Sequence, residues 1–509
     1  MASRIPPLHL AGLLFLGLLW GTTCYRAATQ SVVHDEALTW ELYLAGPVSP
    51  IFDYYDANHH FLATLLERIS TSAFGFSELS LRLPTLLAGA WYFWILFRLC
   101  RLVFGQTPMF AVAVVLAGAN PLILDFLVAA RGYGLALAFL MHALFQMVLY
   151  LAEPPERRGA SRRLLYTAAA SLSLAVAANL TFLLPALSLA VIFILIAKPA
   201  GGGKRPEKRR QRGDVPAAYA ADMRRFVLTI AVFALGFCLV APLDAARVGD
   251  FYAGASTLKE SLRNAVDVSF AHNAGIGGLL QDGRGMRIWL GFLGFALPLL
   301  ALIALGWGSW RFWRASRGGA PLQEAETLLL LTSGAIGGSV GLLIAAHYLI
   351  GFPYPADRTG LYFPALMALC LPALAAALPP RPSWLSLARP AGLAFLILLA
   401  GQFLLQWNTS HFYVWRYDAD SREILTKIQA AGHGQKPAPR IGISWQLEPS
   451  FNFYRTVKGY SWLPPFDRRG PDGDYDYYVL LENDRALIAR RSLRPIYQGP
   501  VSGTVLAVP

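Results

Sequence analysis

The sequence predicts an all-α protein that crosses a membrane many times and ends in a small α/β domain. Two observations carry this prediction. Of the 509 residues, 55% are hydrophobic and only 15% are charged, whereas a soluble domain has about 25% charged residues. The apolar residues also gather in runs of bilayer length, and the chain becomes more polar from about residue 408.

Eleven apolar runs are candidate membrane helices, since a helix needs roughly 17 to 25 residues to cross the hydrocarbon core. They are 8–24, 81–104, 107–124, 132–152, 164–180, 182–197, 226–243, 287–307, 327–350, 361–378 and 390–407. The pair within 164–197 is short because a hairpin divides it. No clear cleavage site follows the first run, so we expect it to remain as an uncleaved helix.

The basic residues predict the orientation of the helices across the membrane. They lie in alternate loops, at Arg98, Arg101, Arg157, Arg158, Arg162, Arg163, the run 198–225, Arg311, Arg314, Arg317, Arg381 and Arg389. Because such loops stay in the cytoplasm, we expect the N-terminus inside and the acidic loop 25–80 outside. The net charge of +13 is therefore a topology signal and does not indicate a nucleic-acid partner.

Residues 408–509 are expected to form a separate external α/β domain, after a membrane domain of residues 1–407. The pattern predicts a helix over 421–431 and strands over 440–445, 477–481 and 486–489. No nucleophile motif or phosphate-binding loop occurs there. A cap over a membrane site, or a docking surface, is the expected role.

Two adjacent acids, Asp35 and Glu36, directly follow the first apolar run. Charged groups at this depth are costly to keep near lipid and often serve a function. The simpler alternative is that both are solvated charges at the end of a membrane helix. Their place relative to the other polar residues decides between these interpretations.

The first external loop also carries Asn58, His59 and His60. Amphipathic segments over 37–46 and 53–72 are expected to lie along the membrane surface. Adjacent histidines diverge by about 100° on a helix and do not form an HxxxH metal pair. Hydrogen bonding at a polar site, a metal site and a plain helix start remain alternatives for the two histidines.

Two further external turns carry arginines. Asp125 is followed by Arg131 and Tyr133, and Tyr354 precedes Arg358. A guanidinium group recognises phosphate through two hydrogen bonds and keeps its charge. The alternatives are an Asp125–Arg131 pair that caps the hairpin and an Arg358 side chain that extends to the lipid interface. Between these turns, 257–270 is predicted to form an amphipathic helix.

Together these residues indicate chemistry at the external membrane face. No Walker A, GxSxG, HExxH or dinucleotide-binding motif is present, and the site faces away from cytoplasmic nucleotides. A lipid-phosphate donor fits, with its headgroup held by Arg131 and Arg358. A carboxylate would accept a proton from an acceptor hydroxyl, and the arginines would stabilise the charge on the leaving phosphate.

The chain resembles the membrane-embedded GT-C glycosyltransferases, in the branch of protein O-mannosyltransferases and the lipid A aminoarabinose transferase. Within it, the bacterial lipopolysaccharide-sugar transferases are the most similar type. The resemblance covers about 8–410. It rests on the motifs His34-Asp35-Glu36, Asn58-His59-His60, Leu81-Arg82-Leu83-Pro84, Leu124-Asp125-Phe126, Ala130-Arg131-Gly132-Tyr133 and Asp357-Arg358.

The resemblance implies an inverting transfer of sugar from a polyprenyl-phosphate donor to a hydroxyl acceptor on a lipid, glycan or protein. Asp35 matches the catalytic base, with Glu36 beside it. Arg131, Tyr133 and Arg358 match positions that face the lipid phosphate, and Tyr354 lies in the same turn as Arg358. The bilayer concerned would be the bacterial inner membrane.

The acceptor or sugar is expected to contact a second group of residues: Asn58, His59, His60 and Asp125. Many relatives have a proline after the first-loop polar motif, where this chain has Phe61. Some members use a divalent metal ion and others do not, so the resemblance fixes no cofactor.

Two other classes of protein remain as alternatives. A transporter or flippase for lipids or glycans would also line a pathway with charged residues, although such proteins often show two matching halves. A polytopic scaffold without catalysis would use the C-terminal domain to bind a partner. Loss of transfer in Asp35→Asn, with normal membrane insertion, would favour the enzyme.

Overall fold

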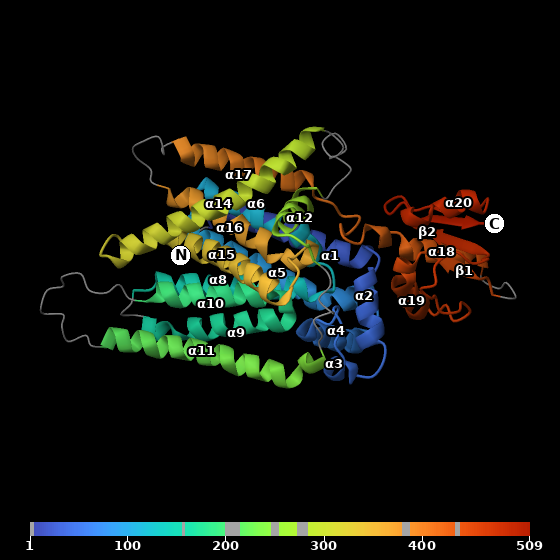
Figure 1. The fold of residues 1–509 in the computed structure, drawn as a ribbon, viewed down its shortest axis with the longest axis horizontal. Coiled ribbons are helices and arrows are strands. Elements are labelled where there is room, and N and C mark those ends of the chain that lie inside the picture. The colour runs from blue at the N-terminus through green and yellow to red at the C-terminus, as the bar shows by residue number, and fades with distance from the viewer. Residues whose placement is uncertain are drawn as a thin grey trace, which may run out of the picture.

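A bundle of long helices makes up most of the molecule, and the C-terminal domain lies against one end of it (Figure 1). The computed structural model describes residues 5–154, 158–198, 214–245, 254–271, 284–378, 387–432 and 438–509. Below, the end of the bundle that carries residues 408–509 is called the capped end. Parts of the basic loops used above as topology signals, among them Arg157, 199–213 and Arg381, lie outside the described residues.

The long helices of the bundle are α1 (Pro7–Thr29), α5 (Glu78–Phe104), α8 (Gly132–Ala152), α9 (Arg162–Ala178), α10 (Leu183–Ala197), α11 (Asp214–Val240), α14 (Arg284–Ser316), α15 (Glu324–Ile350), α16 (Tyr362–Ala377) and α17 (Ala388–Leu405). The shorter ones are α6 (Pro108–Gly118), α7 (Pro121–Phe126) and α12 (Leu258–Phe270). The predicted helix over 257–270 is therefore confirmed.

Within the described ranges, nine helices are long and apolar enough to cross a membrane, so the predicted number of eleven is too high by this measure. The predicted run 107–124 is divided at Asn120, whose side chain accepts a hydrogen bond from the Ile123 N–H and caps α7. Pro121 then begins α7, because its ring fixes a helical φ and needs no hydrogen-bond acceptor. The other missing span, α9, has 17 residues.

The first loop folds at the capped end into four short helices (Figure 1). They are α2 (His34–Thr39), the π-helical turn η1 (Trp40–Leu44), α3 (Pro50–Asp53) and α4 (Phe61–Phe74). The predicted second segment thus becomes regular helix only from Phe61, and His60 occupies the N-cap position before it. Residues 54–60 form a loop that carries both histidines.

The C-terminal domain contains a four-stranded sheet in the order β1-β2-β4-β3. Its elements are α18 (Ser421–Gly432), β1 (Ile441–Ile443), α19 (Glu448–Val457), β2 (Tyr477–Leu480), α20 (Ala486–Arg490), β3 (Arg494–Gln498) and β4 (Val505–Val508). β1 runs parallel to β2, while β4 is antiparallel to both β2 and β3. The fold class, a helical membrane bundle with a small α/β domain, is confirmed.

One of the predicted strands is wrong. Residues 486–489 belong to helix α20, which follows a 3-10 turn over Glu482–Asp484. The third strand is instead β3, an edge strand with four exposed residues and Pro495. Proline is tolerated at such an edge, and the exposure removes the apolar alternation that would have revealed the strand.

A single apolar cluster joins the C-terminal domain to the first loop. It contains Ala37 and Trp40 from α2 and η1, together with Leu425, Phe453 and Leu506 from the C-terminal domain. The chain boundary near residue 408 is therefore not a boundary in packing. The domain and the loop bury their apolar side chains against each other.

Candidate active site

Helix α2 places its two acids in different surroundings. The Glu36 carboxylate is fully buried and accepts hydrogen bonds from Arg82 Nε at 2.9 Å and Arg82 Nη2 at 2.6 Å. It also accepts the backbone N–H groups of Ala130 at 2.7 Å and Val33 at 3.0 Å. With both oxygens engaged in this way, Glu36 fixes α2 to α5 and to the segment before α8.

A second buried ion pair lies nearby, between Arg26 Nη2 and Asp125 Oδ1 at 2.6 Å. Asp125 Oδ2 also accepts the Tyr413 backbone N–H at 2.8 Å. The proposed hairpin cap had paired Asp125 with Arg131, but the ion pair of Asp125 is with Arg26. Asp125 therefore connects the end of α1 to the segment after α17.

Asp35 faces the two arginines that the sequence singled out. Its Oδ2 atom lies 3.0 Å from Arg358 Nη2 and 3.6 Å from Arg131 Nη2, and the side chain is 9% exposed. The Trp415 indole also favours the ionised carboxylate. Burial alone would raise the pKa of Asp35, but the charges of Arg358 and Arg131 outweigh it and hold the pKa below its ordinary value.

Arg131 is held at the start of α8 by the first loop. Its guanidinium donates to Asn58 Oδ1 at 2.7 Å and to Thr39 Oγ1 at 3.1 Å. The next residue is Gly132, where a Cβ would lie 1.9 Å from the carbonyl oxygen of Ala178. The close approach of α8 to the end of α9 thus requires glycine and fixes the direction of Arg131.

Arg358 lies in the short 3-10 turn η7 (Asp357–Gly360), just before α16. Asp357 has φ of 49°, an uncommon value for a residue other than glycine. The Asn264 side chain of α12 donates a hydrogen bond to Asp357 Oδ1 at 2.8 Å and accepts one from the Asp357 backbone N–H at 2.5 Å. These two bonds stabilise the conformation. Such strain often marks functional sites. Here the strained turn directs Arg358 toward Asp35.

Tyr133 and His60 complete the wall around this ion cluster. Tyr133 is among the neighbours that stabilise the charge of Arg358, and the His60 ring packs edge-on against Tyr133 with centroids 5.1 Å apart. His59 stacks on Tyr43 with centroids 4.4 Å apart. Burial lowers the pKa of His59 to about 4, and burial together with Arg131 lowers the pKa of His60 well below its ordinary value. Both imidazoles are therefore neutral near pH 7.

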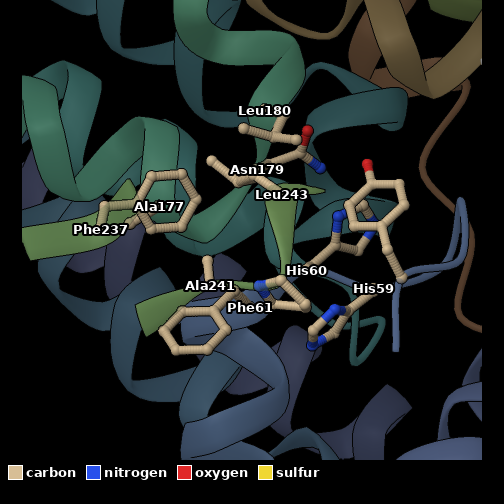
Figure 2. Close-up of a pocket in the computed structure, with 11 residues that line it drawn as sticks. His59, His60, Phe61, Ala177, Asn179, Leu180, Phe237, Ala241 and Leu243 are labelled. Atoms are coloured by element: carbon tan, nitrogen blue, oxygen red, sulfur yellow. The ribbon is translucent and has the colours of Figure 1, made fainter. Parts of the chain in front are cut away.

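A small cavity lies beside the two histidines (Figure 2). Its volume is about 10 Å³, roughly that of one water molecule. Figure 2 shows His59 and His60 at its wall together with Asn179 from the turn after α9. The cavity accommodates a single small polar group and no sugar ring.

A much larger apolar cavity of about 440 Å³ lies between α12, α14, α15 and α16. Phe363, Pro364 and Met367, from the first turns of α16, line it. Ser261 of α12 also lines it and donates a hydrogen bond to the Pro355 carbonyl oxygen at 2.5 Å. The cavity therefore lies next to the turn that carries Arg358, although Arg358 does not line it.

Tyr354 lies apart from the ion cluster. Its backbone pairs with Ala255, and its ring packs against His347 with centroids 4.5 Å apart. The structure therefore brings Asp35, Asn58, His60, Arg131, Tyr133 and Arg358 together in direct contacts. Tyr354, His59, Glu36 and Asp125 lie around this group.

Sequence reasoning missed several residues that shape the site. Arg82 was noted only as part of a motif and Arg26 only as a charge, although a buried arginine in an apolar run needs a partner. Glu67 of α4 is 2% exposed, and burial raises its pKa to about 8, so the carboxyl group is neutral near pH 7. Trp415 carries no charge and left no signal in the sequence.

The residues around Asp35 do not form a divalent-ion site. Among the described residues, no three His, Cys, Asp or Glu side chains are grouped as ligands for a metal ion. The carboxylate that would be the natural ligand faces two guanidinium groups instead. No step proposed below therefore uses a metal ion.

No protein-family model matches the chain, and no curated protein matches it. Among solved structures, ArnT from Cupriavidus metallidurans bound to undecaprenyl phosphate matches with 15% identity over 98% of this chain and 97% of ArnT, at a TM-score of 0.41. The oligosaccharyltransferase AglB from Archaeoglobus fulgidus, in complex with an inhibitory peptide and a dolichol-phosphate, matches with 15% identity over 87% of this chain and 63% of AglB, at a TM-score of 0.40.

The arabinosyltransferase EmbB from Mycobacterium smegmatis matches with 13% identity over 90% of this chain and 44% of EmbB, at a TM-score of 0.32. These proteins are GT-C glycosyltransferases, the class that the sequence motifs resemble. Identities of at most 15% with TM-scores below 0.5 do not establish a shared activity. The chemistry of this chain therefore has to be argued from its own residues.

Proposed function

We propose that the chain is an inverting glycosyltransferase that moves a sugar from a polyprenyl-phosphate donor to a hydroxyl acceptor at the capped end. One observation carries the proposal. The Asp35 carboxylate lies 3.0 Å from Arg358 and 3.6 Å from Arg131, and a 440 Å³ apolar cavity is lined by α12 and α16, the two helices that adjoin the Arg358 turn. Such a site pairs a candidate base with phosphate-binding groups next to space for a lipid chain.

The donor lipid would use the apolar cavity and the arginines together. Its isoprenoid chain is apolar and would lie against α12 and α16, which line the cavity. Its phosphate would lie at Arg358 and Arg131, with the Tyr133 hydroxyl as a further hydrogen-bonding group. Arginine suits this role because its planar group binds phosphate oxygens in pairs and remains charged.

Phosphate binding would also prepare Asp35 to act as a base. The two guanidinium groups now hold the pKa of Asp35 below its ordinary value. A phosphate that takes over these charges would raise that pKa, because an added anion disfavours the ionised carboxylate. Donor binding would thus make Asp35 a stronger base in the complex that needs one.

In the transfer step, the acceptor oxygen forms a bond to the anomeric carbon as its proton passes to Asp35. The bond between that carbon and the phosphate oxygen breaks, and polyprenyl phosphate leaves with the electron pair. Arg358 and Arg131 stabilise the charge on the leaving phosphate. Attack from the face opposite the phosphate inverts the configuration at the anomeric carbon.

The remaining predicted residues divide into two groups. His60 and Asn58 lie beside the arginines and are proposed to contact the sugar or acceptor, with His59 one residue away. Glu36 and Asp125 are already engaged in buried ion pairs. We therefore propose that these two acids hold the site together and do not contact the substrate.

Purified protein in liposomes tests this function with radiolabelled polyprenyl-phosphate sugars. Transfer of label to a lipid, glycan or protein hydroxyl is expected. Movement of the donor across the bilayer without any transfer would instead identify a flippase. Such a result would contradict the proposed chemistry.

The role of Arg358 is tested by Arg358→Lys, with Arg263→Lys on the exposed face of α12 as the matched control. Lysine keeps the charge but loses the paired hydrogen bonds. We expect KM for the donor to rise about 10- to 100-fold, as for loss of a charged hydrogen bond of roughly 1.5 to 3 kcal/mol. An unchanged KM would remove Arg358 from the donor site.

A further inference from the structure

Trp415 lies on the segment that joins α17 to the C-terminal domain, and its side chain is 2% exposed. Its ring packs edge-on against Phe126 of α7, with centroids 5.6 Å apart, and against Phe412 at 6.3 Å. These contacts come from two different segments of the chain. The orientation of the indole is therefore fixed before any substrate binds.

The fixed indole lies beside the central ion pair. The Arg358 guanidinium carbon lies 5.5 Å from the centre of its ring, within the range of a cation–π interaction. The same guanidinium group lies 3.0 Å from the Asp35 carboxylate. One rigid side chain thus supports a candidate phosphate-binding group next to the candidate base.

Trp415 also connects this pair to the C-terminal domain. Its carbonyl oxygen accepts the Asp418 N–H at 3.0 Å. Asp418 Oδ2 accepts the His34 N–H at 2.7 Å, directly before Asp35 in the chain. The indole and the backbone of α2 are therefore held in one hydrogen-bonded arrangement.

We propose that Trp415 is a positioning residue of the active site. Its ring face holds Arg358 beside the Asp35 carboxylate and toward the donor phosphate. The inference rests on the proposed function and extends it. It gives the C-terminal domain a part in catalysis, through the segment that leads into it.

Two substitutions test this contact. Trp415→Phe keeps an aromatic face for Arg358, while Trp415→Leu removes it. Trp462→Phe is the matched control, because it removes an indole hydrogen bond to Gln429 elsewhere in the C-terminal domain. Melting temperature and size-exclusion profile show whether each variant is folded.

In Trp415→Leu we expect a KM for the donor about tenfold higher than in wild type, because the cation–π contact that holds Arg358 is lost. In Trp415→Phe we expect KM for the donor to stay unchanged, because the aromatic face remains.

An unchanged KM in Trp415→Leu would overturn the role of the ring, and so would a KM that rises equally in both variants. If the wild-type protein transfers no sugar, the proposed function itself fails, and binding of polyprenyl phosphate then decides the inference. Weaker binding in Trp415→Leu but not in Trp415→Phe would support it, and equal binding in all three proteins would overturn it.

Discussion

Asp35 and Glu36 are neighbours in the chain, yet one faces a ring of polar groups and the other is sealed inside the protein. Successive residues on a helix point about 100° apart, so α2 directs Glu36 toward Arg82 and Asp35 toward Arg358 and Arg131. An acid fixed by four hydrogen bonds has a structural role. The acid beside it faces the two arginines and makes no such set of backbone contacts among the described residues.

Glu36→Gln is expected to destabilise the protein by about 3 to 5 kcal/mol, because it leaves Arg82 with a buried charge that is no longer compensated. Thermal unfolding in detergent micelles measures the effect. Glu41→Gln changes an exposed acid of the same segment and is the control. Equal melting temperatures for Glu36→Gln and wild type would contradict the structural role.

The sequence was informative about residues whose charge is unusual for their surroundings. Asp35, Arg131 and Arg358 stand out in an apolar chain, and alternate basic loops placed them on one side. Their partners were harder to predict. Arg26 and Asp125 are 99 positions apart, and Trp415 is uncharged, so only the folded chain shows which groups meet.

At the scale of elements, α2 is held between the bundle and the C-terminal domain. The bundle holds it through Glu36 and Arg82. In the C-terminal domain, the Asp418 carboxylate accepts a hydrogen bond from the His34 N–H at 2.7 Å, and the Tyr454 hydroxyl accepts one from the Val32 N–H at 2.7 Å. The position of Asp35 therefore depends on both parts of the molecule.

Asp418 makes the attachment of α2 to the C-terminal domain sensitive to pH. Burial raises its pKa from 3.8 to about 7, while the unfolded chain keeps the ordinary value. Between about pH 4 and pH 7 the folded state therefore binds more protons than the unfolded state, and stability falls as pH rises through this window. The stabilising contribution of the neutral carboxyl group is lost above the folded-state pKa.

We expect the melting temperature of Asp418→Asn to depend less on pH than that of wild type between about pH 4 and pH 7. Other titrating groups, such as Glu67 and His59, are common to both proteins and cancel in the comparison. Asp472→Asn, at an exposed position, is the control. Identical pH dependence in wild type and Asp418→Asn would show that Asp418 does not titrate in this range.

Elements with strong periodicity or length were predictable, and those shaped by caps and edges were not. The long apolar helices and α12 follow from composition and amphipathicity. The run 107–124 looked continuous by hydropathy, but the Asn120 cap and Pro121 divide it. Strand β3 has an exposed face and lacks the alternation of a half-buried strand.

At the scale of the whole molecule, the two ends of the bundle differ in charge chemistry. The candidate site and the C-terminal domain share the capped end (Figure 1). The C-terminal end of α14 lies at the opposite end (Figure 1); Arg314 is in its last turn and Arg317 follows it. By the positive-inside rule we therefore expect the capped end to lie outside the cytoplasm.

Single cysteines test this orientation in a background where the exposed Cys238 is replaced by serine. Lys458→Cys is at an exposed position of the C-terminal domain, and Arg317→Cys is exposed near the other end. In intact cells, a membrane-impermeant maleimide should label Lys458→Cys and not Arg317→Cys. The reverse pattern would place the site on the cytoplasmic side and contradict the proposed topology.

The central claim is that Asp35 is the base and that its two arginines hold the donor phosphate. The most direct test measures sugar transfer and polyprenyl-phosphate binding in Asp35→Asn, with Asp53→Asn as an exposed control in the same loop. Transfer should fall by about 100-fold or more, as for loss of a general base. Binding should persist or tighten, because asparagine no longer competes with phosphate for Arg358 and Arg131. Full transfer by Asp35→Asn, or a loss of transfer explained by lost phosphate binding, would contradict the account.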